Sequence, residues 1–518
     1  MKFIQSLLRR GFEPMEAALS RVFTPAWNPF YQLGAIGFFF LWIVVASGVY
    51  IYIFFDTSIH GAYSSMERLT YNQWYFGGVM RSFHRYASDG MVVVMALHML
   101  REFALDRFRG VRWFSWATGA PVIWLVMISG ITGYWLVWDQ LAQYIAVNTT
   151  EWLDLLPIFG GTIARNFLTN TGLSDRFFTL LVFLHIAVPL FLVFALWIHI
   201  VRVSRAKVNP AFGLMAGITL MLLALSFIKP AVSQPPADMA LVPGELAMDW
   251  YYLAFFPLLD SWPGNSVWAF AGLATLLLMV VPWLPRGSRV PAAVVDLDNC
   301  NGCTRCVEDC PYNAVTMMPR SDGKPFPSEA VVKPKLCVGC GICAGACPSS
   351  TPFRRAVEPI TGIDLPDRPI KVLRQDTEQA AARLTGPSSI LVYSCRYSVA
   401  AKDLENANIA VVDLPCIAAL PPSFIDYVLS RKLANGVALV GCPDSGCYNR
   451  FGVEWMKDRI DRKRDPHLRQ RVPRDRIAAL WIGRFEKAKA KRELQAFSQR
   501  LAQMTPAHSE EDAGVKRA

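Results

Sequence analysis

Long apolar stretches fill the first half of the 518-residue chain and become rare after residue 284. A helix rises 1.5 Å per residue, so about 20 apolar residues cross a bilayer core of about 30 Å. Six stretches have this length or nearly so, at 33–55, 79–100, 114–138, 177–201, 211–228 and 266–284. The pattern predicts an α-helical membrane bundle of six transmembrane helices over 33–284, preceded by an amphipathic segment at 1–32.

The remainder of the chain has a different pattern. Residues 290–358 form two similar halves with eight cysteines, which predicts a small α+β domain with an internal repeat. From 387 to 485, short apolar runs at 389–393, 409–414 and 437–440 alternate with helix-like stretches. This alternation is typical of a small α/β domain. A polar tail is expected at 486–518.

Composition and charge place the apolar half in a membrane. Hydrophobic residues make up 53% of the chain and charged residues only 18%, and the net charge is +11. The four segments that flank the predicted helices on one side of the membrane (1–32, 101–113, 202–209 and 285–289) hold thirteen Lys or Arg and four acidic residues. The three segments on the other side (56–81, 139–176 and 229–265) hold five Lys or Arg and ten acidic residues. The positive-inside rule therefore predicts a multi-pass protein of the bacterial inner membrane with its N-terminus and tail in the cytoplasm, not a nucleic-acid-binding protein. Residues 1–23 lack the apolar core of a signal peptide.

Four of the seven histidines lie in predicted membrane helices, as His84 with His98 and His185 with His199. Each pair is separated by fourteen residues, which places both members on one face of a helix, about 21 Å apart along its axis. One helix lies between the two host helices, so these run parallel and bring His84 level with His185, and His98 level with His199. The arrangement predicts two b-type haems, each held between two histidines.

Two other roles fit single membrane histidines, namely packing and proton relay, but neither requires the matched spacing. Glycines repeat the same interval: Gly34 and Gly48 on the first helix, Gly119 and Gly133 on the third. Glycine lets a porphyrin approach the backbone closely, although it is also common where membrane helices touch.

All twelve cysteines lie between Cys300 and Cys447. Eight of them form two runs of the bacterial two-cluster ferredoxin signature, in which the fourth cysteine of each run ligates the other cluster. The spacing therefore predicts two [4Fe–4S] clusters, one on Cys300, Cys303, Cys306 and Cys347 and the other on Cys337, Cys340, Cys343 and Cys310. Zinc does not match the doubled spacing.

The last four cysteines, Cys395, Cys416, Cys442 and Cys447, each follow or end a β-like run. Strand ends of an α/β sheet meet at one edge, so the four thiols are expected to converge. Their spacing alone allows either an iron–sulfur cluster or zinc.

The membrane part resembles cytochrome b of the quinol-oxidising bc and bf complexes over about 30–284. The resemblance rests on the four histidines, the glycine pairs, Arg81 before His84, the run 132–135 (Thr-Gly-Tyr-Trp), and the stretches 156–160, 175–178, 235–237 and 248–251. It implies haem contacts from Arg81 and an outer quinol site at Asp249 and Tyr251, near the loop at 156–160. It also implies a homodimer formed through this part.

Two positions depart from that family. Asp249 stands where relatives have a proton-accepting Glu, and Ser204 stands where relatives place a His or Arg at the inner quinone site. Asp249 is therefore expected either to accept a quinol proton or to cap the turn that follows it.

The stretch 436–448, which contains Cys442 and Cys447, resembles the delta subunit of methyl-viologen-reducing hydrogenase, and the likeness extends over about 387–485. The resemblance implies one [2Fe–2S] cluster on the last four cysteines and a cytoplasmic partner that is a flavoprotein or a heterodisulfide-reductase-like subunit.

These features predict a quinone-linked oxidoreductase subunit that moves electrons between this partner and the membrane quinone pool. The alternative is a passive membrane anchor and electron wire of a larger dehydrogenase, without a complete quinone site. A redox sensor has little support, because no regulatory module is visible.

Overall fold

The computed structural model describes residues 1–160, 163, 174–203, 206–284, 290–353, 360–386 and 388–504. The chain folds into two compact units, one formed by 1–9 and 32–287 and the other by 10–31 and 288–518. Helix α1 (Lys2–Trp27) begins the chain, and its first residues belong to the first unit. Ser204, which stands where relatives place a His or Arg, lies outside the described residues.

The first unit contains only helices among its described elements. Its α-helices are α2 (Leu33–Phe54), α3 (Gly61–Glu67), α4 (Val79–Ala104), α5 (Trp113–Val137), α6 (Gln140–Asp154), α8 (Asp175–Ile200), α9 (Phe212–Ile228), α10 (Phe256–Ser261) and α11 (Gly264–Val280). Short 3₁₀ turns η1 (Pro29–Gln32), η4 (Gly110–Arg112) and η5 (Val281–Trp283) flank three of them, and two π-helical turns, η2 (Arg68–Asn72) and η3 (Trp74–Gly78), lead into α4.

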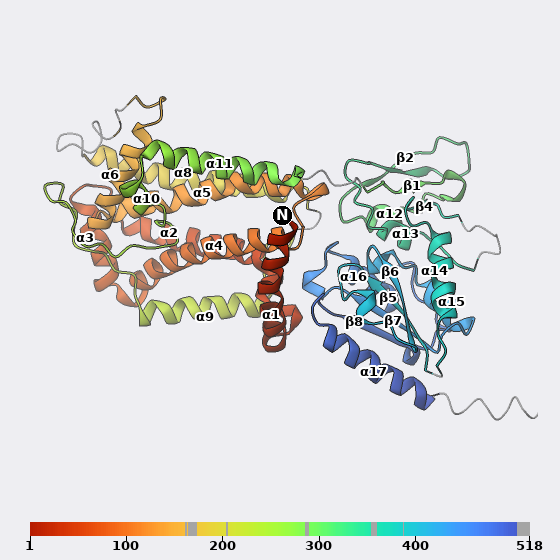
Figure 1. Ribbon diagram of the computed structural model, residues 1–518. Coiled ribbons are helices and arrows are strands. Elements are labelled where there is room, and N and C mark those ends of the chain that lie inside the picture. Colours follow the sequence, from red (N-terminus) through yellow and green to blue (C-terminus); the bar gives the residue numbers. More distant parts are fainter. Residues whose placement is uncertain are drawn as a thin grey trace, which may run out of the picture. The chain divides into compact units, whose positions relative to one another are not determined.

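The long helices pack in pairs, α2 along α4 and α5 along α8, and lie side by side in Figure 1. Their shared core includes Phe40, Val126, Phe178 and Leu192, all buried. Helix α9 packs against α4, and α11 against α5. This arrangement fixes α4 and α8, the two helices that carry the four histidines.

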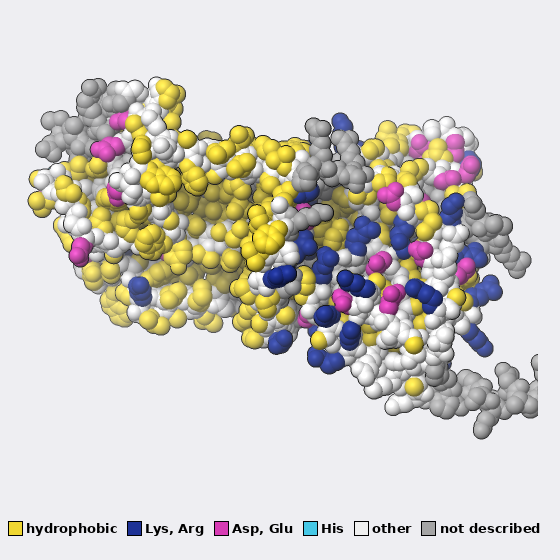
Figure 2. Space-filling view, in the orientation of Figure 1, with side chains coloured by type: hydrophobic (Ala, Val, Ile, Leu, Met, Phe, Trp, Pro, Cys, Tyr) yellow, Lys and Arg dark blue, Asp and Glu magenta, His cyan; other side chains and the backbone are white. Residues whose placement is uncertain are grey.

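The outer surface of this unit is apolar. Phe183 and Phe191 on α8 are each 65% exposed, and apolar side chains cover most of the unit in Figure 2. Four segments are long and apolar enough to cross a membrane: Pro29–Phe54, Trp113–Val137, Asp175–Ile200 and Gly264–Trp283. Helix α9 is apolar but shorter, and α4 carries five charged residues. The first unit is thus a membrane domain, and the six-span topology stays a prediction.

After residue 288, the second unit starts with a small domain that has two antiparallel strand pairs. Strand β1 (Val294–Val295) pairs antiparallel with β4 (Ile363–Asp364), and β2 (Val315–Pro319) with β3 (Ser328–Val332). Two short helices, α12 (Arg305–Glu308) and α13 (Ile342–Ala346), each carry the third cysteine of a run, and η6 (Leu297–Asn299) precedes the first run. Because β4 belongs to it, this domain extends past the expected end at 358.

The internal repeat is visible in the backbone. Gly302 and Gly339 both have positive φ angles, 68° and 61°, and so do Thr304 and Gly341, 64° and 75°. Each residue occupies the same place relative to the first cysteine of its run. Left-handed backbone there turns the chain sharply between successive cysteines, a conformation that glycine adopts at little cost.

The rest of the second unit is a four-stranded parallel sheet in the order β6-β5-β7-β8. Its strands are β5 (Ile390–Cys395), β6 (Ile409–Leu414), β7 (Gly436–Gly441) and β8 (Ile477–Trp481). The accompanying α-helices are α14 (Ile370–Ala382), α15 (Ser423–Ser430), α16 (Gly452–Ile460) and α17 (Lys487–Met504), with 3₁₀ turns η7 (Ala401–Asp403), η8 (Ile417–Ala419), η9 (Asp444–Gly446) and η10 (Arg474–Arg476).

Both faces of this sheet are covered, because its strands alternate between two cores. Leu391 and Tyr393 enter the core that also holds α14, whereas Ile390 and Val392 face α17. Apolar side chains of α17, such as Phe497, are buried there. The α/β domain therefore includes α14 and α17, which lie outside the expected limits 387–485, and 487–504 is a packed helix where sequence predicts a polar tail.

Candidate functional site

The four histidines lie where the fourteen-residue spacing places them, two on α4 and two on α8. His84 and His185 are neighbours: their ring centroids are 6.2 Å apart and their planes differ by 61°. A metal–imidazole bond is about 2 Å long and each ring centroid lies about 1 Å behind its nitrogen, so two rings on one iron have centroids about 6 Å apart. The spacing of these rings fits one iron between them.

Each predicted glycine faces one predicted histidine. A Cβ added to Gly48 would lie 3.0 Å from Cε1 of His84, and one added to Gly133 would lie 2.9 Å from Cε1 of His185. The corresponding distances are 3.7 Å from Gly34 to His98 and 3.4 Å from Gly119 to His199. The glycines on α2 and α5 thus leave the space in which the imidazoles, and a flat group between them, can sit.

Three hydroxyl groups, which the sequence analysis did not identify, contact the histidines. Thr132 Oγ1 lies 3.2 Å from His185 Nδ1, Thr118 Oγ1 lies 3.3 Å from His199 Nδ1, and Ser47 Oγ lies 3.3 Å from His84 Nδ1. Each of these residues directly precedes one of the facing glycines. A Ser or Thr directly before the glycine occurs at three of the four glycine positions, and this sequence pattern could have indicated the hydroxyl contacts.

These contacts decide which ring nitrogen is free. Each hydroxyl donates its proton to the carbonyl four residues earlier, as Thr132 does to Ile128 O at 2.8 Å, so it accepts from Nδ1–H of the histidine. His84 Nδ1 also lies 2.9 Å from the Val44 carbonyl, which can only accept. The proton therefore sits on Nδ1, and Nε2 keeps the lone pair that binds a metal.

Arg81, one turn before His84, is buried and fully engaged. It forms an ion pair with Glu67 at 3.5 Å, donates to Ser233 Oγ at 2.7 Å and also donates to Thr70. These contacts tie the π-helical turn η2 to the chain after α9. A contact between Arg81 and haem stays a proposal.

Asp249 lies in a polar cluster inside the first unit. Its Oδ1 accepts from the Tyr251 backbone N–H at 2.6 Å, so it does cap its own turn. Its Oδ2 pairs with Arg85 Nη2 at 2.8 Å and accepts from the Tyr134 hydroxyl. Both oxygens are therefore occupied, and Tyr251 is half-exposed.

The loop at 156–160 follows α6, whose end packs near the Asp249 segment. Trp152 contacts Phe255 at 5.5 Å between ring centroids and stacks on Trp268 at 3.9 Å. Ile158 in the loop is 79% exposed. The end of α6 thus contacts Phe255, four residues after Tyr251, and an outer pocket between the two stretches stays a prediction.

The eight cysteines of the two runs lie in two sets in the structure. Burial, together with the neighbouring thiols of Cys303, Cys347 and Cys300, raises the pKa of the Cys306 thiol to about 12. Burial also raises the pKa of the Cys343 thiol, on which Cys340, Cys337 and Cys310 act more strongly than Cys306 of the first run. Cys347 thus lies with the first run and Cys310 with the second. Soft thiolates in two sets of four fit iron–sulfur cubanes.

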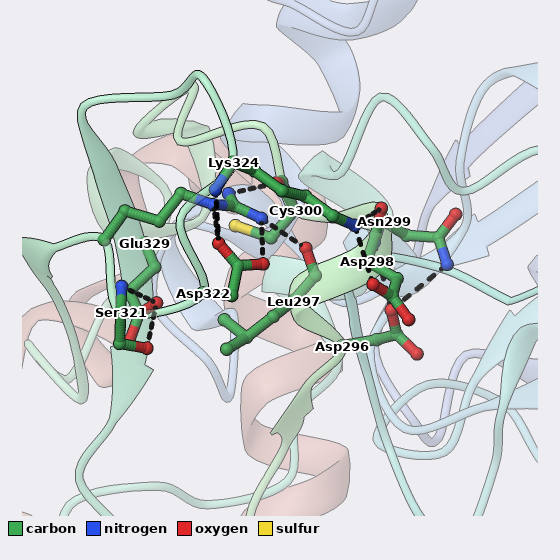
Figure 3. Close-up of polar contacts among 10 residues, drawn as sticks. Asp296, Leu297, Asp298, Asn299, Cys300, Ser321, Asp322, Lys324 and Glu329 are labelled. Atoms are coloured by element: carbon green, nitrogen blue, oxygen red, sulfur yellow. Dashed lines mark hydrogen bonds and ion pairs between the residues drawn. The ribbon is translucent and has the colours of Figure 1, made fainter.

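Polar contacts hold the loop that carries Cys300, as Figure 3 shows. Arg320, just after β2, donates to the Cys300 carbonyl and to the Leu297 carbonyl, each at 2.6 Å. The same guanidinium pairs with Asp322 and lowers the pKa of that carboxyl to about 2. Lys324 Nζ contacts Asp298 Oδ1 at 2.6 Å on the other side of the loop.

The last four cysteines converge at the carboxyl ends of β5, β6 and β7. Cys395 Sγ lies 3.9 Å from Cys442 Sγ. Hydrogen bonds to Cys416 and Cys442 raise the pKa of the Cys395 thiol, and a bond to Cys442 raises that of Cys447, whereas a bond from Cys395 lowers the pKa of Cys416. In the described ranges, no three His, Cys, Asp or Glu side chains are placed to chelate a single metal ion.

A buried ion pair joins the two parts of the second unit. Arg459 on α16 pairs with Asp309 at 2.5 Å, and their side chains are 0% and 2% exposed. Arg464 also pairs with Asp309, and Trp455 Nε1 donates to its carbonyl at 3.3 Å. Asp309 directly precedes Cys310. Nearby, a Cβ on Gly341 would lie 2.9 Å from Ala419 Cβ, so α13 packs against η8 after Cys416.

Comparison with known proteins matches each part of the chain to a family. The model of cytochrome b/b6/petB matches residues 19–207, that of the 4Fe-4S dicluster domain matches 299–351, and that of the methyl-viologen-reducing hydrogenase delta subunit matches 391–505. Cytochrome b6 of Gracilaria tenuistipitata var. liui is 30% identical over 196 residues, which are 37% of this chain and 88% of that protein. The chain belongs to the cytochrome b/b6 family.

Other relatives extend the comparison. Cytochrome b of Rhodospirillum rubrum is 25% identical over 290 residues, which cover 50% of this chain and 70% of that protein. A solved structure described as a hyperthermophilic respiratory Complex III covers 49% of this chain and 75% of its own, with 22% identity and a TM-score of 0.41.

Together, these matches confirm the three-part fusion predicted from the sequence. The protein is an integral membrane cytochrome b with a dicluster domain and a hydrogenase-delta-like domain, which makes it an electron-transfer protein. The cytochrome b match implies haem b, and the dicluster match implies iron–sulfur clusters. The residues described above are those that fit these groups.

Proposed function

We propose that this cytochrome b is the membrane subunit of a quinone-linked oxidoreductase of the bacterial inner membrane. It moves electrons between the quinone pool and a cytoplasmic flavoprotein or heterodisulfide-reductase-like partner. The observation that supports this most is the His84–His185 ring pair, spaced for one iron, in the same chain as three groups of four cysteines. The orientation, with N-terminus and tail in the cytoplasm, rests on the basic flanks.

The proposed ligands follow the grouping of the side chains. His84 with His185 and His98 with His199 hold two b haems, and Arg81 lies beside the outer one. Cys300, Cys303, Cys306 and Cys347 hold one [4Fe–4S] cluster, and Cys337, Cys340, Cys343 and Cys310 hold the other. The last four cysteines hold a [2Fe–2S] cluster. Bound, these groups supply one-electron carriers, and the cytochrome b part forms a homodimer.

The contacts within the second unit favour one order for the soluble carriers. Of the thiols near Cys340, that of Cys416 raises the pKa of the Cys340 thiol most, and α13 packs against the turn that follows Cys416. We therefore place the Cys310–Cys337–Cys340–Cys343 cluster next to the Cys395–Cys416–Cys442–Cys447 cluster. The buried Asp309–Arg459 pair supports a fixed distance between the two.

A second function, a passive anchor and wire without its own quinone site, is favoured by one observation. Both oxygens of Asp249 are already occupied by Arg85, Tyr134 and the Tyr251 backbone N–H.

Quinol-dependent haem reduction in the purified full-length protein separates the two functions. The oxidised protein is mixed anaerobically with a short-chain quinol, and the haem absorbance is followed. If the chain has its own quinone site, the haem is reduced within seconds, and reduction saturates with quinol concentration. Haem that dithionite reduces but the quinol leaves oxidised would contradict the proposed function and favour the anchor.

A further inference from the structure

Two carboxylates from distant parts of the chain meet inside the membrane domain. Asp89 lies on α4, and Asp249 lies in the segment before α10. Arg85 bridges them: its Nε is 3.2 Å from Asp89 Oδ2 and its Nη2 is 2.8 Å from Asp249 Oδ2. The two carboxyl groups are also within hydrogen-bonding reach of each other. Asp249 is a candidate site residue from sequence alone, whereas Asp89 is not.

Both carboxyl groups are shielded from solvent. Asp89 is 9% exposed, and the Asp249 side chain is 5% exposed. Both carboxylate oxygens of Asp249 accept hydrogen bonds. Asp89 Oδ1, in contrast, is buried and accepts no hydrogen bond within the described residues. A buried carboxylate oxygen without a donor is costly, and the cost falls when that oxygen carries a proton.

The surrounding charges do not balance two ionised carboxylates. Among the described residues, Arg85 is the cation that contacts both, and its guanidinium also lies 4.5 Å from the Tyr134 ring centroid. The other titratable groups that interact with Arg85 or Asp89 in this part of the structure are phenols: Tyr86 on α4, Tyr134 on α5, and Tyr252, whose hydroxyl is 2.7 Å from Ser88 Oγ. Helices α2 and α9, which pack on α4, contain no charged residue.

Arg81 does not add a positive charge to this cluster, because it forms an ion pair with Glu67. Two carboxylates in contact with one guanidinium carry a net charge of −1, and like charges so close cannot both ionise easily. One proton shared by the pair makes the cluster of Asp89, Asp249 and Arg85 neutral.

We propose that Asp89 and Asp249 form a proton-binding pair that holds one proton when the neighbouring haem is oxidised and takes up a second when it is reduced. Asp89 follows His84 by five residues, about 7.5 Å along the helix axis. The electron that reduces the ferric haem adds one negative charge, and the proton that forms an O–H bond at Asp89 Oδ1 offsets it. The proposal rests on the proposed function, in which a quinol hydroxyl supplies that proton.

The experiment is a redox titration of the haems in the full-length holoprotein at several pH values. Proton uptake on reduction makes the midpoint potential fall as pH rises, toward about 59 mV per pH unit for one proton per electron. We expect this slope for one of the two haems in the parent protein and less than half of it in Asp89→Asn. Asp89→Glu, which restores a carboxyl group, should recover the slope.

Asp260→Asn is the matched control, because Asp260 is an exposed carboxylate of the same domain, bonded to the Tyr144 hydroxyl at 2.6 Å. Its slopes should equal those of the parent. If Asp89→Asn does not incorporate haem, Asp249→Asn is measured with the same expectation. A reduced-minus-oxidised infrared spectrum should show a protonated-carboxyl band in the parent that is missing in Asp89→Asn.

Two results would overturn the proposal: a parent protein in which neither haem potential depends on pH, or an unchanged slope in both Asp89→Asn and Asp249→Asn. The titration uses mediators and needs no quinol. Failure of the pair therefore remains distinguishable from failure of the quinone-linked function, which appears as haem that the quinol does not reduce.

Discussion

At the scale of single residues, hydroxyl groups beside glycines prepare the histidines for iron. Ser47, Thr118 and Thr132 each accept from a histidine Nδ1–H while donating to their own helix. No such hydroxyl precedes Gly34, which faces His98, because residue 33 is leucine. An acceptor at Nδ1–H makes the imidazole a stronger donor to iron and stabilises the ferric state.

Thr132→Val should therefore retain haem but raise the midpoint potential of one haem. The valine has nearly the same shape and lacks the acceptor of His185 Nδ1–H. A hydrogen bond is worth about 0.5–1.5 kcal/mol net, which corresponds to a rise on the order of 20–60 mV for one electron. Redox titration at a single pH measures the shift.

Thr219→Val on α9 is the matched control, because Thr219 also donates to the carbonyl four residues earlier, at 2.9 Å, but contacts no histidine in the described structure. An equal shift in both variants, or no shift in Thr132→Val, would contradict the role given to Thr132.

Residue neighbours can be read from the sequence where spacing alone defines the geometry. Fourteen residues fix one helix face, so His84 and His185 meet as expected. The partners of Asp249 could not be read in this way, because Arg85 and Tyr134 reach it from α4 and α5, over more than a hundred positions of sequence. Their contact depends on how the helices pack.

At the scale of secondary-structure elements, the apolar pattern predicted the helices and the sheet well and their limits less well. Runs at 389–393, 409–414 and 437–440 became β5, β6 and β7. The fourth strand, β8, and the packed helix α17 were missed. Strand β8 is apolar but only five residues long and directly follows a charged stretch, and α17 has few large apolar residues. Helix α17 buries one apolar stripe and exposes a highly charged face, and only the sheet beneath it reveals that stripe.

The buried contact between α16 and the dicluster domain leads to a stability prediction. Arg459→Met should destabilise the second unit by about 1–3 kcal/mol, because the buried Asp309 carboxylate loses one of its two charged partners and keeps only Arg464. Urea unfolding of the full-length protein, followed by the visible absorbance of the iron–sulfur clusters, measures the effect.

Arg383→Gln removes an exposed pair with Glu405 and serves as the control, with an expected cost below about 1 kcal/mol. The double variant Asp309→Leu with Arg459→Met should recover part of the loss, since no charge is then left buried alone. If Arg459→Met unfolds at the same urea concentration as Arg383→Gln, the buried pair does not stabilise this contact.

At the scale of the whole molecule, one chain joins a membrane cytochrome b to two soluble iron–sulfur domains. The cysteine and histidine spacings, together with the resemblances of 30–284 and 387–485 to known families, predicted this fusion, and the family comparisons confirm it. Chain order also places the dicluster domain directly after the last apolar helix, between the haem ligands and the last four cysteines. The central claim is that electrons pass along this order, between the soluble clusters and the quinone, through the haems.

Reoxidation of the fully reduced, full-length protein by a short-chain quinone tests this claim most directly. Haem absorbance and the cluster signals are followed together after anaerobic mixing, in the parent and in His98→Ala, which should lack the His98–His199 haem and keep the other. In the parent, haems and clusters should be reoxidised together. In His98→Ala, the remaining haem should be reoxidised as in the parent. The clusters should be reoxidised at least tenfold more slowly than in the parent. Clusters that are reoxidised equally fast in both proteins would contradict the account.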